Sequence, residues 1–165
     1  MGALSSGVLA PDFKLTTTDG RTISLKEALR RGPVLAAFFK ISCPVCQMTL
    51  PYLERLYKAY PSEKFTIVGV SQNDKKDTQA FAKEYGITLP LAIDPSDKYT
   101  GSNAYGLTNV PTLFFIGTDG SIELSSVGWA KADFEELNRR LAKLAGVQPK
   151  PLFKPGEDVP EFKAG

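Results

Sequence analysis

The sequence contains no histidine, only two cysteines and a single tryptophan. A structural zinc site needs four Cys or His side chains, so one chain of this composition cannot complete such a site, and we expect no metal. An excess of one charge is also lacking, because 20 Lys and Arg residues face 18 Asp and Glu residues. With a net charge of +2 and no basic run, we expect no nucleic acid partner.

Long hydrophobic runs are missing too. The longest apolar run, Val34–Phe39, is far too short to span a bilayer, so we expect no membrane partner. The first ten residues have neither the basic region nor the apolar core of a signal peptide. The sequence therefore predicts a cytoplasmic protein, or a periplasmic one if a leader has been removed.

The length of 165 residues and an apolar content of 42% fit one globular domain with a sizeable core. We place this domain at residues 1–146 and a proline-rich tail at residues 147–165. Four prolines argue against a helix or an inner strand in the tail. Because the tail also carries apolar side chains, we expect it to be extended and partly docked. These are Leu152, Phe153, Val159 and Phe162.

The hydrophobic pattern predicts alternating strands and helices. Strands are expected at residues 13–15, 22–25, 34–39, 65–70, 89–93, 112–116 and 122–127. Helices are expected at residues 44–60, 75–85, 98–105 and 132–145, the first of them kinked at Pro51. Turns at Asp19-Gly20 and Asp119-Gly120 join strands into hairpins. The order predicts an α/β fold, a central mixed sheet with helices on both faces.

Both cysteines stand in the motif Cys43-Pro44-Val45-Cys46, between an apolar strand and a predicted helix. If the helix begins at Pro44, Cys43 is its N-cap, where free N–H groups and the helix dipole stabilise a thiolate. The thiolate is the attacking species in disulfide exchange. Cys46, one turn on and buried under Cys43, can close the disulfide. We interpret the motif as a redox site rather than a static disulfide.

Further short motifs follow one another in a fixed order. They are Ala10-Pro11-Asp12-Phe13, the Cys43–Cys46 site, Pro51, Tyr85-Gly86-Ile87, Val110-Pro111-Thr112, Asp119-Gly120 and Gly128-Trp129. In this order they resemble the thioredoxin superfamily, in its alkyl hydroperoxide reductase/thiol-specific antioxidant-like (redoxin) branch. The resemblance covers about residues 7–145. It implies a thioredoxin-like fold with an N-terminal β-hairpin and an inserted strand and helix before the cis-proline strand.

The resemblance also implies a substrate groove. The Val110–Pro111 bond would be cis and would present backbone groups to an extended substrate peptide beside Cys43. Gly128 would line the same groove, where a side chain would block a partner's backbone. Two positions depart from thioredoxins, since Ser42 replaces the tryptophan before the first cysteine and Ala37 replaces the buried acid.

The sequence thus predicts a thiol–disulfide oxidoreductase acting on protein or small-molecule disulfides. Cys43 would attack, Cys46 would resolve the mixed disulfide, and an upstream thiol reductant would restore the dithiol. No bound cofactor is required, and we expect a monomer whose partners are a disulfide-containing protein substrate and that reductant.

The alternative is a thiol-dependent peroxidase of the peroxiredoxin type. Peroxiredoxins have Pro-x-x-x-Thr-x-x-Cys here, and with Cys46 as the last residue the Pro and Thr positions fall on Phe39 and Cys43. A copper-binding assembly protein of the same fold would need a histidine ligand. A redox-inert interaction module using the tail is disfavoured because both cysteines are present.

Overall fold

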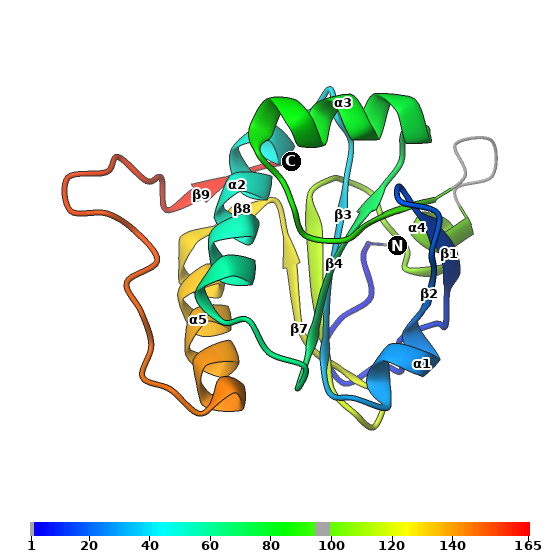
Figure 1. Ribbon diagram of the computed structural model, residues 1–165, viewed down its shortest axis with the longest axis horizontal. Coiled ribbons are helices and arrows are strands. Elements are labelled where there is room, and N and C mark those ends of the chain that lie inside the picture. Colours follow the sequence, from blue (N-terminus) through cyan, green and yellow to red (C-terminus); the bar gives the residue numbers. More distant parts are fainter. Residues whose placement is uncertain (1, 95–99) are drawn as a thin grey trace.

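The computed structural model describes residues 2–94 and 100–165, with a seven-stranded sheet at its centre (Figure 1). The strands are β1 (Lys14–Thr17), β2 (Thr22–Ser24), β3 (Val34–Phe39), β4 (Thr66–Ser71), β5 (Leu91–Ile93), β6 (Thr112–Ile116) and β7 (Ile122–Val127). They lie in the order β2-β1-β5-β4-β3-β6-β7. Strands β3, β4 and β5 are parallel, whereas β1 and β6 join them antiparallel. The predicted mixed sheet and the N-terminal hairpin β1–β2 are confirmed.

Helices cover both faces of the sheet. They are α1 (Leu25–Leu29), α2 (Pro44–Ala59), α3 (Lys75–Tyr85), α4 (Thr100–Ala104) and α5 (Lys131–Ala145). Strand β5 and helix α4 lie between α3 and β6 and correspond to the predicted insertion. Within the ranges that the structure describes, no helix is both long enough and apolar enough to cross a membrane.

Strand β3 is buried along its whole length because its alternate side chains enter two different cores. Leu35 and Phe39 belong to the cluster formed with α2, α3 and α5. Ala36 and Phe38 belong to the cluster on the other face, which α1 helps to close. Burying a Leu or Phe side chain stabilises the fold by roughly 1.5–3 kcal/mol. The two cores therefore fix the end of β3, where the cysteine motif begins.

Several element boundaries differ from the prediction by one or two residues, and two of these differences have a clear local cause. Leu25, predicted to end a strand, begins α1 because the Ser24 hydroxyl accepts a hydrogen bond from the Glu27 N–H and caps the helix. Strand β5 begins at Leu91 rather than residue 89, since the Glu54 carboxylate accepts hydrogen bonds from the N–H groups of Thr88 and Leu89. The predicted helix at residues 98–105 is seen as α4, and residues 98–99 lie outside the described residues.

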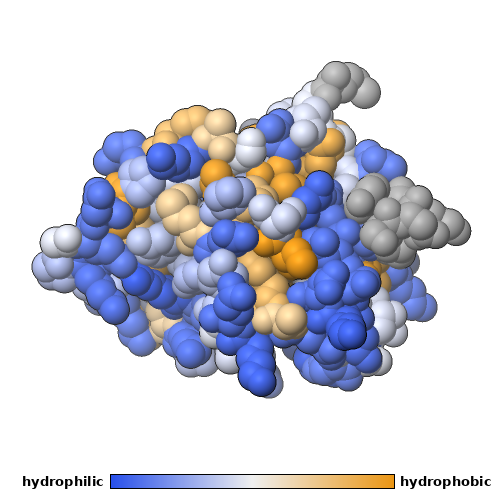
Figure 2. Space-filling view, turned by 90° about the horizontal axis from the view of Figure 1, so that it is seen from above, coloured by the Kyte–Doolittle hydropathy of each residue, from blue (hydrophilic) through white to orange (hydrophobic). Residues whose placement is uncertain are grey.

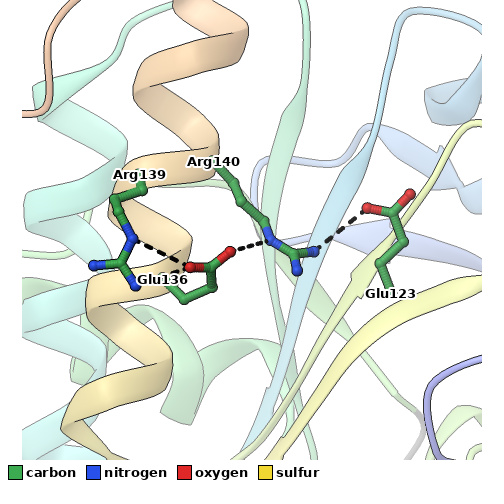
Figure 3. Close-up of polar contacts among 4 residues, drawn as sticks. All are labelled: Glu123, Glu136, Arg139 and Arg140. Carbon is green, nitrogen blue, oxygen red and sulfur yellow. Dashed lines mark hydrogen bonds and ion pairs between the residues drawn. The ribbon is translucent and has the colours of Figure 1, made fainter.

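An ion-pair network fastens α5 to the sheet at β7 (Figure 3). The Arg140 guanidinium lies 2.8 Å from the Glu136 carboxylate and 3.4 Å from that of Glu123 on β7. Arg139 lies 2.8 Å from Glu136 on the same helix. Hydrogen bonds from Arg140 and Arg139 hold the pKa of Glu136 below its usual value. The network lies outside the cysteine motif and joins α5 to β7 of the sheet.

The tail is extended and docked as predicted, but one of its apolar side chains is not buried. Its residues Phe162–Lys163 form a short strand, β9, which pairs antiparallel with β8 (Trp129–Ala130). Leu152 is buried as expected, but the Phe162 side chain is 61% exposed. The tail is attached at β9 through its backbone, which explains why an apolar side chain there stays in solvent. Figure 1 shows it passing α5 and returning to the N-terminal end of α2.

Candidate active site

The cysteine motif lies where β3 gives way to α2. Cys43 is the N-cap of α2, and Pro44 is the first helical residue, as predicted. The Sγ atom of Cys43 accepts a hydrogen bond from the Cys46 N–H at 3.2 Å. An N-terminal helix N–H directed at sulfur stabilises negative charge on it. The local sequence thus places the sulfur of Cys43 at the N-terminus of α2, directly against a helix N–H.

Side chains hold the loop before Cys43 in place. The Ile41 N–H donates to the Asn73 Oδ1 atom at 2.9 Å, which ties the loop to the segment after β4. The Gln47 Nε2 atom donates to the Ile41 carbonyl oxygen at 2.9 Å. Both contacts fix the path of the backbone into α2 and preorganise the position of the Cys43 sulfur.

The two thiols are free and differ in exposure. Cys43 is half-buried, whereas Cys46 is completely buried. Burial raises the pKa of the Cys46 thiol well above its usual value, and a backbone hydrogen bond with Lys40 only partly opposes this. An incoming disulfide can therefore reach the half-buried Cys43 sulfur more readily than the buried Cys46 sulfur.

The segment predicted to face the sulfurs does so. The Val110–Pro111 bond is cis, and the Cys43 thiol donates a hydrogen bond to the Val110 carbonyl oxygen at 3.5 Å. The Gly128 N–H donates to the Pro111 carbonyl oxygen at 2.7 Å. All five residues singled out from the sequence, Cys43, Cys46, Val110, Pro111 and Gly128, thus belong to one site.

A hollow beside Cys43 is lined by segments from four parts of the chain. Its lining includes Ser42, Cys43, Gln72, Asn109, Val110 and Gly165. Ser42 is exposed, so the wall that tryptophan provides in thioredoxins is absent. Figure 2 shows the face seen from above Figure 1, where apolar residues gather in the middle of a largely hydrophilic surface.

Gly128 does not line open space. A Cβ atom at this residue would lie 2.4 Å from the carbonyl oxygen of Lys163, so the tail already occupies the place expected for a partner's backbone. The Asn109 Nδ2 atom also donates to the Gly165 carbonyl oxygen at 3.2 Å. Asn109 and Gly165 were missed by sequence reasoning, because residues so far apart in the chain carry no local signal of their contact.

Other residues near the motif have structural roles. Asp74, which follows β4 in the chain, caps α3 by accepting a hydrogen bond from the Asp77 N–H. Trp129 is fully buried and packs on Tyr52 and Phe134, with ring centroids 4.9 and 4.5 Å apart. Ala37 lies in the core, where thioredoxins have an acid.

A Cys-x-x-Cys pair at a helix N-terminus beside a cis-proline, on a mixed sheet covered by helices, defines a redox protein of the thioredoxin fold. The AhpC/TSA family profile matches residues 6–125. The chain belongs to this family.

Named relatives agree with this assignment. The thiol-disulfide oxidoreductase ResA of Geobacillus thermodenitrificans is 33% identical over 122 residues, which is 73% of this chain and 68% of the relative. A thiol:disulfide interchange protein of the thioredoxin family from Chlorobium tepidum superposes with a TM-score of 0.66 at 29% identity, covering 88% of this chain and 99% of that one. The thioredoxin domain of a Bacteroides vulgatus thiol-disulfide oxidoreductase, at 21% identity, supports the fold with a TM-score of 0.74 over 84% of this chain and 99% of that domain.

Proposed function

We propose that Cys43 is the attacking thiol and Cys46 the resolving thiol of a thiol–disulfide oxidoreductase. The protein is an enzyme of this class, which acts on disulfides and takes its electrons from a thiol reductant. One observation carries the assignment of roles: the half-buried Cys43 sulfur receives a helix N–H and lies beside the Val110 carbonyl, while Cys46 is fully buried.

The reaction transfers two electrons in two exchanges. The Cys43 thiolate attacks one sulfur of the substrate disulfide, forms a mixed disulfide and releases the other substrate sulfur as a thiolate. Cys46 then loses its proton, and its thiolate attacks the Cys43 sulfur and releases the second substrate thiolate. The substrate leaves as two thiols and the protein as the Cys43–Cys46 disulfide. A dithiol reductant reverses the exchange and restores the enzyme.

The burial of Cys46 assigns an order to these steps. A buried thiol with a raised pKa is a poor nucleophile toward outside disulfides, and it becomes useful only when the disulfide to be attacked lies beside it. Since the two cysteines are one helical turn apart, the mixed disulfide on Cys43 brings such a bond within reach.

A thiol-dependent peroxidase is not favoured. Phe39 stands where a peroxiredoxin has proline, and it is fully buried against Phe81 with a centroid distance of 5.4 Å. Cys43 stands where a peroxiredoxin has threonine. The groups that would hold and polarise a peroxide next to Cys46 are therefore replaced by core packing and by the second thiol. The names of the relatives support disulfide exchange as well.

The substrate is proposed to be a protein disulfide in a locally extended chain, since Val110 offers its backbone beside Cys43. The enzyme is proposed to act as a monomer, which light scattering on the purified chain would test. Its location is proposed to be the cytoplasm, or the periplasm if a leader has been removed, and fractionation of the cells that make it is the direct measurement.

Trapping of mixed disulfides tests the proposed roles. In Cys46→Ser, the mixed disulfide cannot be resolved. Covalent adducts with insulin, whose disulfides are intact at the start, should therefore accumulate on Cys43. The matched variant Cys43→Ser keeps one thiol in the same motif but should form almost no adduct. Equal trapping by both variants would contradict the assignment of the attacking thiol.

A further inference from the structure

Residues 163–165 of the tail lie between Gly128 and Val110, in the groove that an extended substrate would occupy. After Glu157, the chain reaches Trp129, whose indole N–H donates to the Pro160 carbonyl oxygen at 2.7 Å. The Lys131 N–H then donates to the Glu161 carbonyl oxygen at 3.0 Å, and β9 pairs with β8. Residues 162–163 therefore form an added strand along β8, and residues 164–165 continue from it toward Val110.

At two glycines, the backbone of this segment lies very close to the backbone of the site. At Gly128, with φ of +77°, a Cβ atom would lie 2.4 Å from the Lys163 carbonyl oxygen. At Gly165, a Cβ atom would lie 2.2 Å from the Val110 carbonyl oxygen. Distances below 3 Å leave no room for a carbon atom, so backbone faces backbone on both sides. No second extended chain fits between Val110 and Gly128 while residues 163–165 are there.

The segment is held firmly upstream and lightly at the groove. Upstream, Leu152 is buried, and the Arg55 guanidinium binds the Glu157 carboxylate with two hydrogen bonds of 2.7 Å. At the groove, residues 161–165 are all exposed, and they are held by the β8–β9 backbone pairing, a surface ion pair of Glu161 with Lys131 and the hydrogen bond from Asn109. A tethered segment has a high effective concentration at its site, yet a lightly held one can be displaced.

We propose that residues 161–165 are an autoinhibitory segment, which occupies the backbone-binding groove beside Cys43 and must be displaced by an extended polypeptide substrate. This inference rests on the proposed function, since the groove matters only if Cys43 exchanges disulfides. It adds a selection step: a small disulfide can reach the half-buried Cys43 sulfur past the segment, whereas an extended chain has to compete with it.

Two variants release the segment by different means. Deletion of residues 161–165 removes it and leaves the upstream contacts of Leu152 and Glu157 intact. Gly165→Val keeps the length but places a side chain against the Val110 carbonyl. The matched control is Val147→Ala, which shortens an apolar side chain of the tail that is 49% exposed and lies outside residues 161–165.

The assay compares oxidation of each reduced protein by insulin and by hydroxyethyl disulfide. We expect both releasing variants to react with insulin at least about fivefold faster than the unaltered chain, because the competing tethered strand is gone. Rates with hydroxyethyl disulfide should stay within about twofold for all proteins, and Val147→Ala should match the unaltered chain. Unchanged insulin rates, or equal acceleration with both disulfides, would overturn the proposal.

A binding measurement separates this inference from the proposed function. An end-blocked peptide of sequence Glu-Phe-Lys-Ala-Gly, added to the deletion variant, should shift the amide resonances of Val110 and Gly128 and slow insulin reduction. The same peptide should leave the unaltered chain unchanged. If neither the unaltered chain nor any variant reduced insulin or hydroxyethyl disulfide, the proposed function would fail. The resonance shifts alone would then decide whether the segment binds the groove. Absence of those shifts would overturn the autoinhibitory contact.

Discussion

The Sγ atom of Cys43 lies 3.5 Å from the carbonyl oxygen of Val110, although 67 residues separate them in the chain. The pairing of β3 with β6 brings them together, since Phe38 at the end of one strand lies opposite Thr112 at the start of the other. The attacking sulfur and the backbone that would receive a substrate are therefore fixed by one pair of buried strands.

The first prediction concerns the reactivity of the two thiols. In the reduced protein near pH 7, iodoacetamide should modify Cys43 at least about tenfold faster than Cys46, because a buried thiol with a raised pKa is seldom a thiolate. Peptide mapping by mass spectrometry measures both rates in one sample. Faster modification of Cys46 would contradict the burial of Cys46 and the greater exposure of Cys43.

The second prediction concerns the contact between Gly128 and the tail. Gly128→Ala should speed hydrogen exchange of the Lys131 amide, because the new Cβ atom pushes Lys163 away and breaks the neighbouring bond to Glu161. Gly146→Ala is the matched control, since Gly146 has a φ of +75° and open space where the Cβ would be.

Both substitutions introduce the backbone strain of a left-handed residue, about 1–2 kcal/mol. Only Gly128→Ala adds the collision with the tail. Equal exchange of the Lys131 amide in the two variants would show that the tail does not press on Gly128.

The third prediction concerns the ion pair that anchors the tail. Hydrogen bonds from Arg55, and one from the Lys154 N–H, lower the pKa of Glu157 from its usual 4.5 to about 2. Because the folded-state pKa is lowered, the contribution to docking is present above pH 4.5 and is lost as the pH falls toward 2. An NMR titration of the Glu157 carboxyl should therefore have its midpoint near 2.

Arg55→Gln is the control for this titration, and it should move the midpoint up toward 4.5. The comparison isolates the charged partner, since glutamine keeps a hydrogen-bond donor without the charge. A midpoint near 4.5 in the unaltered chain would mean that the ion pair does not form in solution.

Long, strongly patterned elements were predictable from the sequence. The continuous apolar run of β3 and the caps of α2 and α3 at Cys43 and Gly86 are local signals, and the structure has them where predicted. Helix α1 was missed because five residues are too few for a helical period. Its capping residue, Ser24, also suits a strand.

The site was predictable where a motif marks it, and not elsewhere. Cys43, Cys46 and the Val110–Pro111 bond stand in recognisable motifs. The contact of Gly165 with Val110 depends on backbone approach between distant segments, which no side-chain pattern encodes. The exposed Phe162 shows the same limit, since its apolar character predicted burial while the β9 backbone makes the contact.

The most direct test of the central claim compares two oxidants of the reduced protein. Stopped-flow fluorescence would follow its oxidation by insulin disulfides and by hydrogen peroxide under the same conditions. The account predicts that insulin is reduced through Cys43, and that peroxide reacts no faster than with an ordinary exposed thiol, because Phe39 and Cys43 replace the peroxide-activating residues. Peroxide oxidation faster by orders of magnitude, with insulin left untouched, would contradict disulfide exchange as the function of this site.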